Sequence, residues 1–217
     1  MSFPIVVLIS GNGSNLQALI DQSLQGELDI NICAVISNKA DAYGLERAKS
    51  VGIATHALNH KLFDSREEFD AELQKIIDQY QPKLVVLAGF MRILTEAFTK
   101  HFEGRMLNIH PSLLPKYKGL NTHQRAIDAN DTEHGISVHF VSSELDAGAV
   151  ILQASTQVDK EETAETLATK VHALEHIIYP LAVKWFSEGR LSFYDGHAIL
   201  DGKTLPESGI LYSKALI

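Results

Sequence analysis

The architecture follows from one sequence near the amino terminus, Pro4-Ile-Val-Val-Leu-Ile-Ser-Gly-Asn-Gly-Ser-Asn-Leu-Gln-Ala-Leu-Ile20. The unbroken apolar run that ends at Ser10 predicts a buried strand, and the glycines that follow predict a tight turn. Apolar residues then recur at positions 16, 19, 20 and 24, which is the spacing of an amphipathic helix. We therefore predict a strand, a glycine turn and a helix, in that order.

The same alternation continues outward along the chain. Apolar runs at 30–37 and 84–88 predict two more buried strands, and helices are expected at 43–51 and 65–80. The second helix begins at the capping box Ser65-Arg-Glu-Glu68. Strands that alternate with helices predict an α/β fold with a Rossmann-like, twisted, mostly parallel sheet and helices on both faces.

The pattern changes after Pro111. The segments 135–141 and 149–158 predict an antiparallel strand pair, and a long helix is expected at 163–186. With about 150 residues per domain as a guide, 217 residues favour a single domain. We expect this domain to have a first half, 1–110, and a second half, 111–217.

Composition and charge exclude several classes of function. Nineteen Lys and Arg against 27 Asp and Glu give a net charge of −8, so the chain has no overall attraction to nucleic acid. A single cysteine, Cys33, excludes an internal disulfide and a thiolate zinc cage, which favours a cytoplasmic location. No apolar run approaches the roughly 20 residues that span a bilayer, and no charged signal-peptide segment precedes the first strand, so no membrane partner is expected.

The glycine turn has the chemistry of an anion site. Gly13, Ser14 and Asn15 open the first helix, where backbone N–H groups and the helix dipole would favour a phosphate. A dinucleotide site is disfavoured because Leu16 replaces the third glycine of the fingerprint and no ribose-binding acid follows the second strand. The alternative is that the glycines only permit the turn.

A second candidate site follows a short strand at 106–109. Asn108 and His110 lie two residues apart, so both side chains point to one face of the strand at its carboxyl end. An amide and an imidazolium there could stabilise an oxyanion, and Asp146 is the candidate that keeps the imidazole charged. The alternative is an ordinary histidine at a strand end and an aspartate in a turn.

A third pattern suggests a metal. The sequence His172-Ala-Leu-Glu-His176 fits the inverted zinc-hydrolase motif, in which two histidines hold the metal. The motif is short and the chain has 10 histidines. Because no third ligand can be identified, we expect ordinary helix histidines and no metal site.

Four segments together resemble the folate-dependent formyltransferase family. They are Leu8-Ile-Ser-Gly-Asn-Gly-Ser-Asn-Leu-Gln17, Val86-Leu-Ala-Gly-Phe-Met-Arg-Ile-Leu94, Asn108-Ile-His-Pro-Ser-Leu-Leu-Pro115 and Leu145-Asp-Ala-Gly148. The third and fourth resemble the signature shared by transferases and hydrolases that use 10-formyltetrahydrofolate, and the first resembles the glycinamide ribonucleotide branch. The resemblance implies proline in many relatives at the position where this chain has Lys118.

The resemblance implies roles for individual residues. Asn108, His110 and Asp146 would be catalytic, and Asn108 would also contact folate. The acceptor substrate would be held by Gly13, Ser14, Asn15 and Glu175, and 10-formyltetrahydrofolate by Arg66, Met91, Arg92, Ile93 and Leu94. The implied reaction is formyl transfer to 5-phosphoribosylglycinamide in purine biosynthesis, with neither a metal nor NAD, in a monomer or weak homodimer that binds only small molecules.

Other functions remain open. A formyltetrahydrofolate hydrolase, or a formyltransferase acting on another amine such as that of methionyl-tRNA, would use the same catalytic residues. The hydrolase is expected to carry an additional regulatory domain and the tRNA enzyme an additional tRNA-binding domain. A non-enzymatic nucleotide-binding module would keep the glycine turn without needing Asn108, His110 and Asp146.

Overall fold

A computed structural model describes residues 2–213. These residues form two compact units with the boundary between Asn108 and Ile109, inside strand β5. Each unit is described by itself below.

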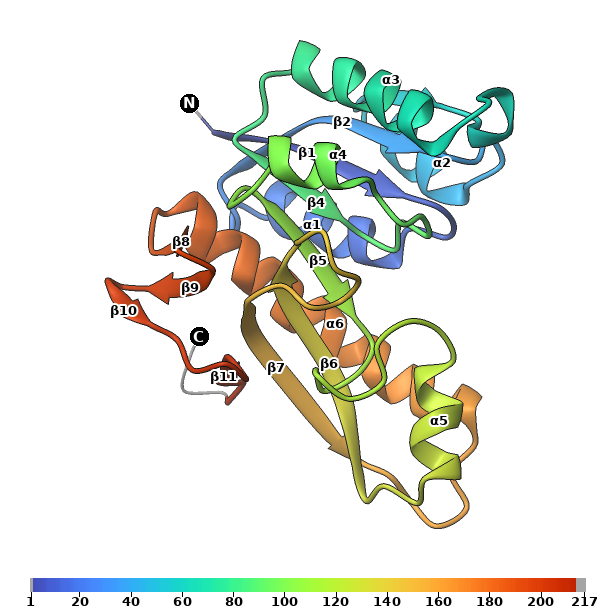
Figure 1. Cartoon of the computed structure of the whole chain (residues 1–217), viewed down its shortest axis with the longest axis vertical. Helices are drawn as coiled ribbons and strands as arrows, with labels where there is room; N and C mark the ends of the chain where they lie inside the picture. Colours follow the sequence, from blue (N-terminus) through green and yellow to red (C-terminus); the bar gives the residue numbers. More distant parts are fainter. Residues whose placement is uncertain (1, 214–217) are drawn as a thin grey trace. The chain divides into compact units, whose positions relative to one another are not determined.

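The first unit is an alternation of strands and helices (Figure 1). Its strands are β1 (Phe3–Ile9), β2 (Ile30–Ser37), β3 (Ala54–Ala57), β4 (Leu84–Leu87) and β5 (Met106–His110). Its helices are α1 (Ser14–Leu24), α2 (Tyr43–Ser50), the 3-10 helix η1 (His60–Leu62), α3 (Arg66–Gln79) and α4 (Glu96–His101). The strand–turn–helix order predicted for residues 4–24 is therefore confirmed.

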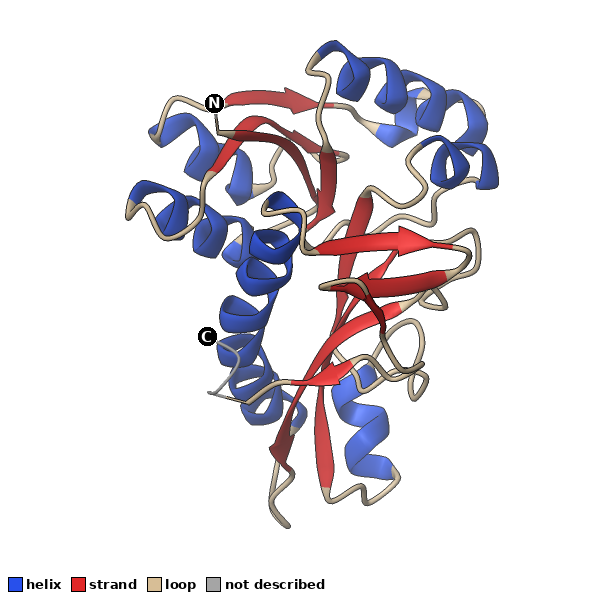
Figure 2. Cartoon of the chain, turned by 90° about the vertical axis from the view of Figure 1, so that its left-hand side faces the viewer, coloured by secondary structure: helices blue, strands red, loops and turns tan. Residues whose placement is uncertain are grey.

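The sheet of the first unit is parallel throughout. Its strands lie in the order β3-β2-β1-β4-β5, and each neighbouring pair is parallel. Helices lie on both sides of these strands (Figure 2). All residues of β4 and most of β1 are buried, as their unbroken apolar sequences require. This parallel arrangement brings the carboxyl ends of β1, β2 and β4 to the same edge of the sheet.

The predicted cap of α3 is present, with one difference. The Ser65 hydroxyl accepts a hydrogen bond from the Glu68 N–H at 3.1 Å. The Glu68 carboxylate accepts from the N–H of Asp64 at 3.2 Å, whereas a capping box would use the N–H of Ser65. The Glu68 carboxylate therefore binds the N–H one residue before the one that the motif assumes.

The second unit contains antiparallel strands and a long helix. Its elements are α5 (Thr122–Asp128), β6 (Glu133–Phe140), β7 (Val150–Gln157), α6 (Ala164–Ser187), β8 (Leu191–Tyr194), β9 (His197–Leu200), β10 (Lys203–Thr204) and β11 (Ile210–Leu211). The antiparallel pairing of β6 with β7 confirms the prediction for this half. Strand β11 adds to β7 in parallel, and β8, β9 and β10 form a small antiparallel sheet.

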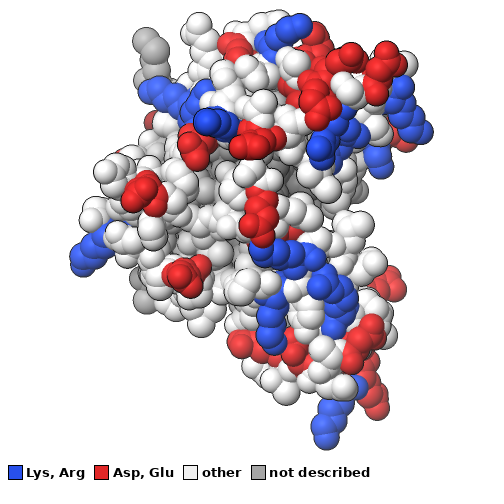
Figure 3. Space-filling view, in the orientation of Figure 1, with Lys and Arg blue, Asp and Glu red and all other residues white. Residues whose placement is uncertain are grey.

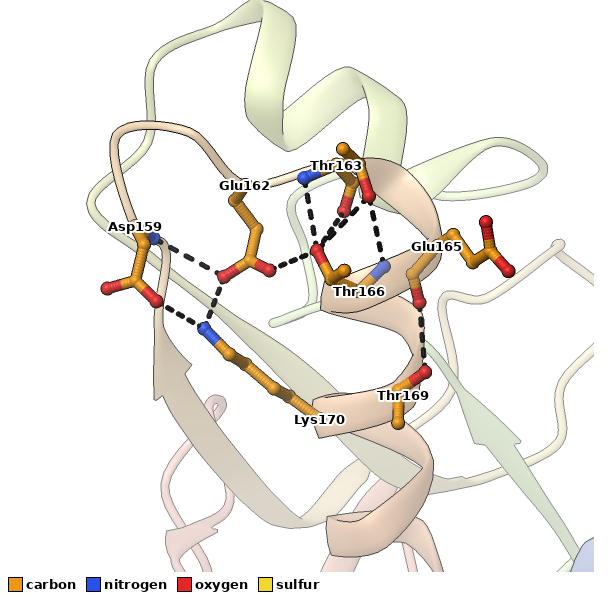
Figure 4. Close-up of polar contacts among 7 residues, drawn as sticks. All are labelled: Asp159, Glu162, Thr163, Glu165, Thr166, Thr169 and Lys170. Carbon is orange, nitrogen blue, oxygen red and sulfur yellow. Dashed lines mark hydrogen bonds and ion pairs between the residues drawn. The ribbon is translucent and has the colours of Figure 1, made fainter.

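Helix α6 begins in a polar network (Figure 4). The Thr163 hydroxyl accepts from the Thr166 N–H at 3.2 Å and completes a capping box. Lys170 pairs with Asp159 at 2.6 Å and also with Glu162, and these contacts tie the loop after β7 to the helix. Hydrogen bonds from Lys170 and Thr166 lower the pKa of the Glu162 carboxyl. The network fixes the start of the helix that carries Glu175.

No helix within residues 2–213 combines the length and apolar character that crossing a membrane would need.

Candidate active site

The glycine turn between β1 and α1 depends on close backbone packing. Gly13 has φ of 76° and caps α1 without a side-chain hydrogen bond. A Cβ atom on Gly13 would lie 2.8 Å from the Gly44 Cα, and one on Gly44 would lie 2.5 Å from the Ile9 side chain. Both positions therefore need glycine, and the turn leads directly into the positive end of the α1 dipole. The half-buried Ser14 and buried Asn15 belong to this turn.

The predicted folate segment, Met91–Leu94, follows β4 and is anchored at its start. The N–H of Met91 donates to the Ser10 hydroxyl at 2.7 Å, and that hydroxyl donates to the buried Asn38 amide oxygen at 2.5 Å. The segment therefore begins next to the glycine turn. Met91 and Ile93 are 67% and 55% exposed, so an apolar surface is available for an aromatic ring. Leu94 is buried and packs in the core.

The end of the same segment is held by Asp70 of α3. Its buried carboxylate accepts from the Thr95 N–H at 2.6 Å, and burial raises the Asp70 pKa. The positive charges of Arg92 and Arg66 both act on this carboxylate, so the structure brings the two predicted folate-binding arginines to one place. The guanidinium carbon of Arg92 also lies over the Phe69 ring, 4.7 Å from its centroid.

The second unit brings His110 and Asp146 together. His110 Nδ1 lies 3.3 Å from Asp146 Oδ2, and both side chains are 7% exposed. His110 Nε2 donates to the Tyr117 carbonyl at 2.9 Å, and Asp146 Oδ2 accepts from the Gly119 N–H at 2.9 Å. Each ring nitrogen thus faces an oxygen acceptor, and only the imidazolium can donate to both. The loop after β5 therefore fixes the ring and leaves Nδ1 as the nitrogen that faces the carboxylate.

The structure adds His139 to this pair. His139 Nε2 lies 3.8 Å from Asp146 Oδ1, and its Nδ1 donates to the Phe140 carbonyl at 2.8 Å. Burial lowers the pKa of His139, which favours the neutral ring. Sequence reasoning missed this residue, although Ser137 and His139 repeat the spacing of two polar residues on an apolar strand that identified Asn108 and His110.

The loop between β5 and α5 carries positive charge. Lys116 pairs with Asp131 at 2.9 Å, Lys118 pairs with Glu144 at 3.0 Å, and Arg125 donates to the Lys118 carbonyl at 2.7 Å. Figure 3 shows Lys and Arg side chains gathered on this part of the second unit. Lys118 therefore links its loop to the loop that contains Asp146.

Glu175 and the neighbouring histidines lie on α6. Glu175 is 5% exposed, His172 is exposed, and burial lowers the pKa of His176. Among residues 2–213, no group of three or more His, Cys, Asp and Glu side chains is placed to hold a metal ion.

Two further histidines, on α5 and β6, contact each other. His123 Nδ1 lies 3.1 Å from His134 Nε2, so one ring donates to the other. Burial, followed by the charges of His134, His172 and His110, lowers the pKa of His123 to about 4. Between pH 6.5 and about 4, His123 therefore binds a proton in the unfolded chain and not in the folded chain.

This difference predicts acid sensitivity. The contribution of a neutral His123 to stability is complete above pH 6.5 and is lost as the pH falls toward 4. The thermal unfolding midpoint of the parent protein should therefore fall between about pH 7 and about pH 5. In the variant His123→Gln this fall should be smaller by about 2–4 °C. Equal differences in both proteins would contradict the assignment.

Comparison with known proteins places these features in a family. Residues 4–183 match the family model described as formyl transferase. The chain is 57% identical over 205 residues to phosphoribosylglycinamide formyltransferase of Escherichia coli, covering 94% of this chain and 97% of that protein. It is 45% identical over 185 residues to the human trifunctional purine biosynthetic protein adenosine-3, covering 85% of this chain and 18% of that longer protein.

Solved structures agree. The phosphoribosylglycinamide formyltransferase from Coxiella burnetii superposes with a TM-score of 0.94 at 58% identity, covering 98% of this chain and 100% of that one. The glycinamide ribonucleotide transformylase 1 from Symbiobacterium toebii gives 0.89 at 41% identity, covering 92% and 94%. The chain therefore belongs to the formyl transferase family, and within it to the phosphoribosylglycinamide formyltransferases.

Proposed function

We propose that this enzyme transfers the formyl group of 10-formyltetrahydrofolate to the amine of 5-phosphoribosylglycinamide. The products are formylglycinamide ribonucleotide and tetrahydrofolate. The observation that carries the proposal is the buried pair of His110 and Asp146, in which both ring nitrogens face oxygen acceptors. Family membership supplies the reaction class, and this pair supplies the charged donor that the reaction needs.

The substrate amine attacks the formyl carbon, and the carbonyl oxygen becomes an oxyanion. We propose that Asn108 and the imidazolium of His110 donate hydrogen bonds to this oxygen, whose charge develops only during the reaction. The Tyr117 carbonyl accepts from Nε2–H, so we propose that Nδ1, which lies 3.3 Å from Asp146 Oδ2, shares its proton between Asp146 and the reacting groups. Asp146 favours the proton on Nδ1 because a nearby carboxylate stabilises the charged ring.

The tetrahedral intermediate then loses N10 of tetrahydrofolate. The amine gives up one proton and N10 takes one, so the protons balance across the reaction. His110 would deliver the proton directly, or through a water molecule oriented by Asp146. Such general acid catalysis is worth about 10²- to 10⁴-fold in rate.

The binding roles are proposals of the same kind. The N–H groups at the positive end of the α1 dipole suit a phosphate, and Gly13, Ser14 and Asn15 would hold it. Arg66 and Met91–Leu94 would hold the folate, with Met91 and Ile93 as its apolar contacts. Asn108 would contact the folate, and Glu175 would hold the glycinamide end of the acceptor. We further propose that residues 1–110 and 111–217 act as nucleotide-binding and folate-binding halves of one domain, in which Arg66 and Met91–Leu94 of the first half also contact the folate. The domain would act as a cytoplasmic monomer or weak dimer.

The acceptor can be tested by competition between amines. With 10-formyltetrahydrofolate as donor, we expect mass spectrometry to detect formylation of 5-phosphoribosylglycinamide and not of free glycinamide or methionyl-tRNA. Formylation of methionyl-tRNA at a comparable rate would replace the proposed acceptor with another amine.

The proposal also predicts independence of metal. Activity should persist after dialysis against EDTA, because no proposed step uses a Lewis acid. Loss of activity on chelation that zinc restores, together with stoichiometric zinc in active protein, would return His172 and His176 to the role of metal ligands.

A further inference from the structure

Arg47, on α2, is bonded to the glycine turn through all three of its guanidinium nitrogens. Nε donates to the Asn12 carbonyl at 2.9 Å, Nη2 to the Asn12 amide oxygen at 2.9 Å, and Nη1 to the Gln17 amide oxygen at 3.0 Å. Its guanidinium carbon lies 4.8 Å from the centroid of the Tyr43 ring. The planar fork therefore binds the residue before Gly13 and the first turn of α1 together.

A second contact holds the same turn against α2. The Gly44 N–H donates to the Gly11 carbonyl at 3.0 Å, and the backbones at Gly13 and Gly44 approach too closely for a side chain. The turn is thus fastened by backbone packing on one side and by Arg47 on the other. Loss of the guanidinium would remove the donors to the Asn12 carbonyl and side chain and leave the turn held on its backbone side.

The charge of Arg47 adds to this restraint. Its three acceptors are neutral amide oxygens, while the adjacent Glu46 pairs with Lys49 at 2.7 Å. No acidic residue lies in the first turn of α1. The positive charge therefore stands beside a helix terminus that already favours anions.

We propose that Arg47 is a positioning residue for the acceptor phosphate. It holds the Asn12–Gly13 peptide so that the N–H groups of the first turn converge on the anion, and it adds positive charge behind them. The inference rests on the proposed phosphate site at Gly13, Ser14 and Asn15. Lysine is not an equivalent residue, because an ammonium cannot reproduce the three-point fork.

The test compares two acceptors that differ by the phosphate. For each protein, kcat/KM is measured with 5-phosphoribosylglycinamide and with its dephosphorylated riboside, and their ratio reports phosphate recognition. Arg47→Met should lower this ratio by about 10- to 100-fold, since small misplacements of a binding group cost rates of that order. The ratio for Arg47→Lys should lie between those of the parent protein and Arg47→Met. KM for 10-formyltetrahydrofolate should stay within about twofold.

A matched control is Arg105→Met. Arg105 donates to the His101 carbonyl at 3.1 Å and stacks on Phe102 at 4.8 Å, so it has similar contacts away from the turn. The variant Arg105→Met should leave the ratio of the two kcat/KM values unchanged. A general loss of structure would lower kcat/KM for both acceptors together, and if Arg47→Met does not fold, Arg47→Lys gives the same comparison.

The outcomes separate the two proposals. A large ratio in the parent protein that both Arg47 variants retain would overturn the role of Arg47 and leave the phosphate site intact. A ratio near one in the parent protein would overturn the phosphate site itself, and the role of Arg47 with it.

Discussion

Replacing His110 with alanine is expected to lower kcat by about 10²- to 10⁴-fold while leaving KM for both substrates within a fewfold of the parent values. The imidazolium acts on charge that develops only during the reaction, so its loss should affect turnover and not ground-state binding. By the usual conversion this is about 3 to 5 kcal/mol of transition-state stabilisation. Steady-state kinetics with each substrate varied in turn provide the measurement.

The chain offers a matched control for this variant. His101 Nε2 pairs with Asp78 at 3.1 Å, but the two side chains are 35% and 41% exposed. His101→Ala removes the same kind of pair from a solvated surface and should leave kcat unchanged. A His110→Ala variant with parent-like turnover would show that the buried pair is not catalytic and would overturn the proposed role of His110.

The variant Asp146→Asn is expected to lower kcat by about 10²- to 10³-fold at neutral pH, the cost of losing one strong donor to an oxyanion. Asparagine keeps an acceptor for the Gly119 N–H and tolerates the φ of 47° at this position. What it removes is the negative charge beside His110 Nδ1. The imidazolium then loses its counter-charge, and less of the enzyme carries the proton.

The pH profile separates this role from a structural one. Because the imidazolium has lost its counter-charge, a higher proton concentration should restore it in part, so Asp146→Asn should regain part of its activity as the pH is lowered from neutral. Asp78→Asn is the control and should follow the parent profile. Loss of turnover by the same factor at every pH would contradict the proposed effect on His110.

Local patterns predicted much of the fold. The boundaries of β2 and α2 follow from apolar spacing and glycine positions, because those signals lie within the element itself. The pairing of β11 with β7 could not be predicted in this way, since it depends on contacts between distant segments. The partner of Glu68 was also misjudged, because a shift of one residue in the turn decides which N–H it reaches.

The same division applies to the site. The motif containing Asn108 and His110 is continuous in the sequence and stands out on an apolar strand. The contact of His139 with Asp146 and the bond of Tyr117 to His110 depend on where β6 and the loop after β5 lie. The bonds from Arg47 to Asn12 likewise join residues 35 positions apart, so no local signal identifies them.

The central claim is tested most directly by the turnover of 10-formyltetrahydrofolate, followed by absorbance with and without 5-phosphoribosylglycinamide. We expect consumption of the donor only when the acceptor is present, with one formylglycinamide ribonucleotide formed for each donor consumed. Equal consumption with water alone would contradict the transferase assignment and would indicate a hydrolase that uses the same pair of His110 and Asp146.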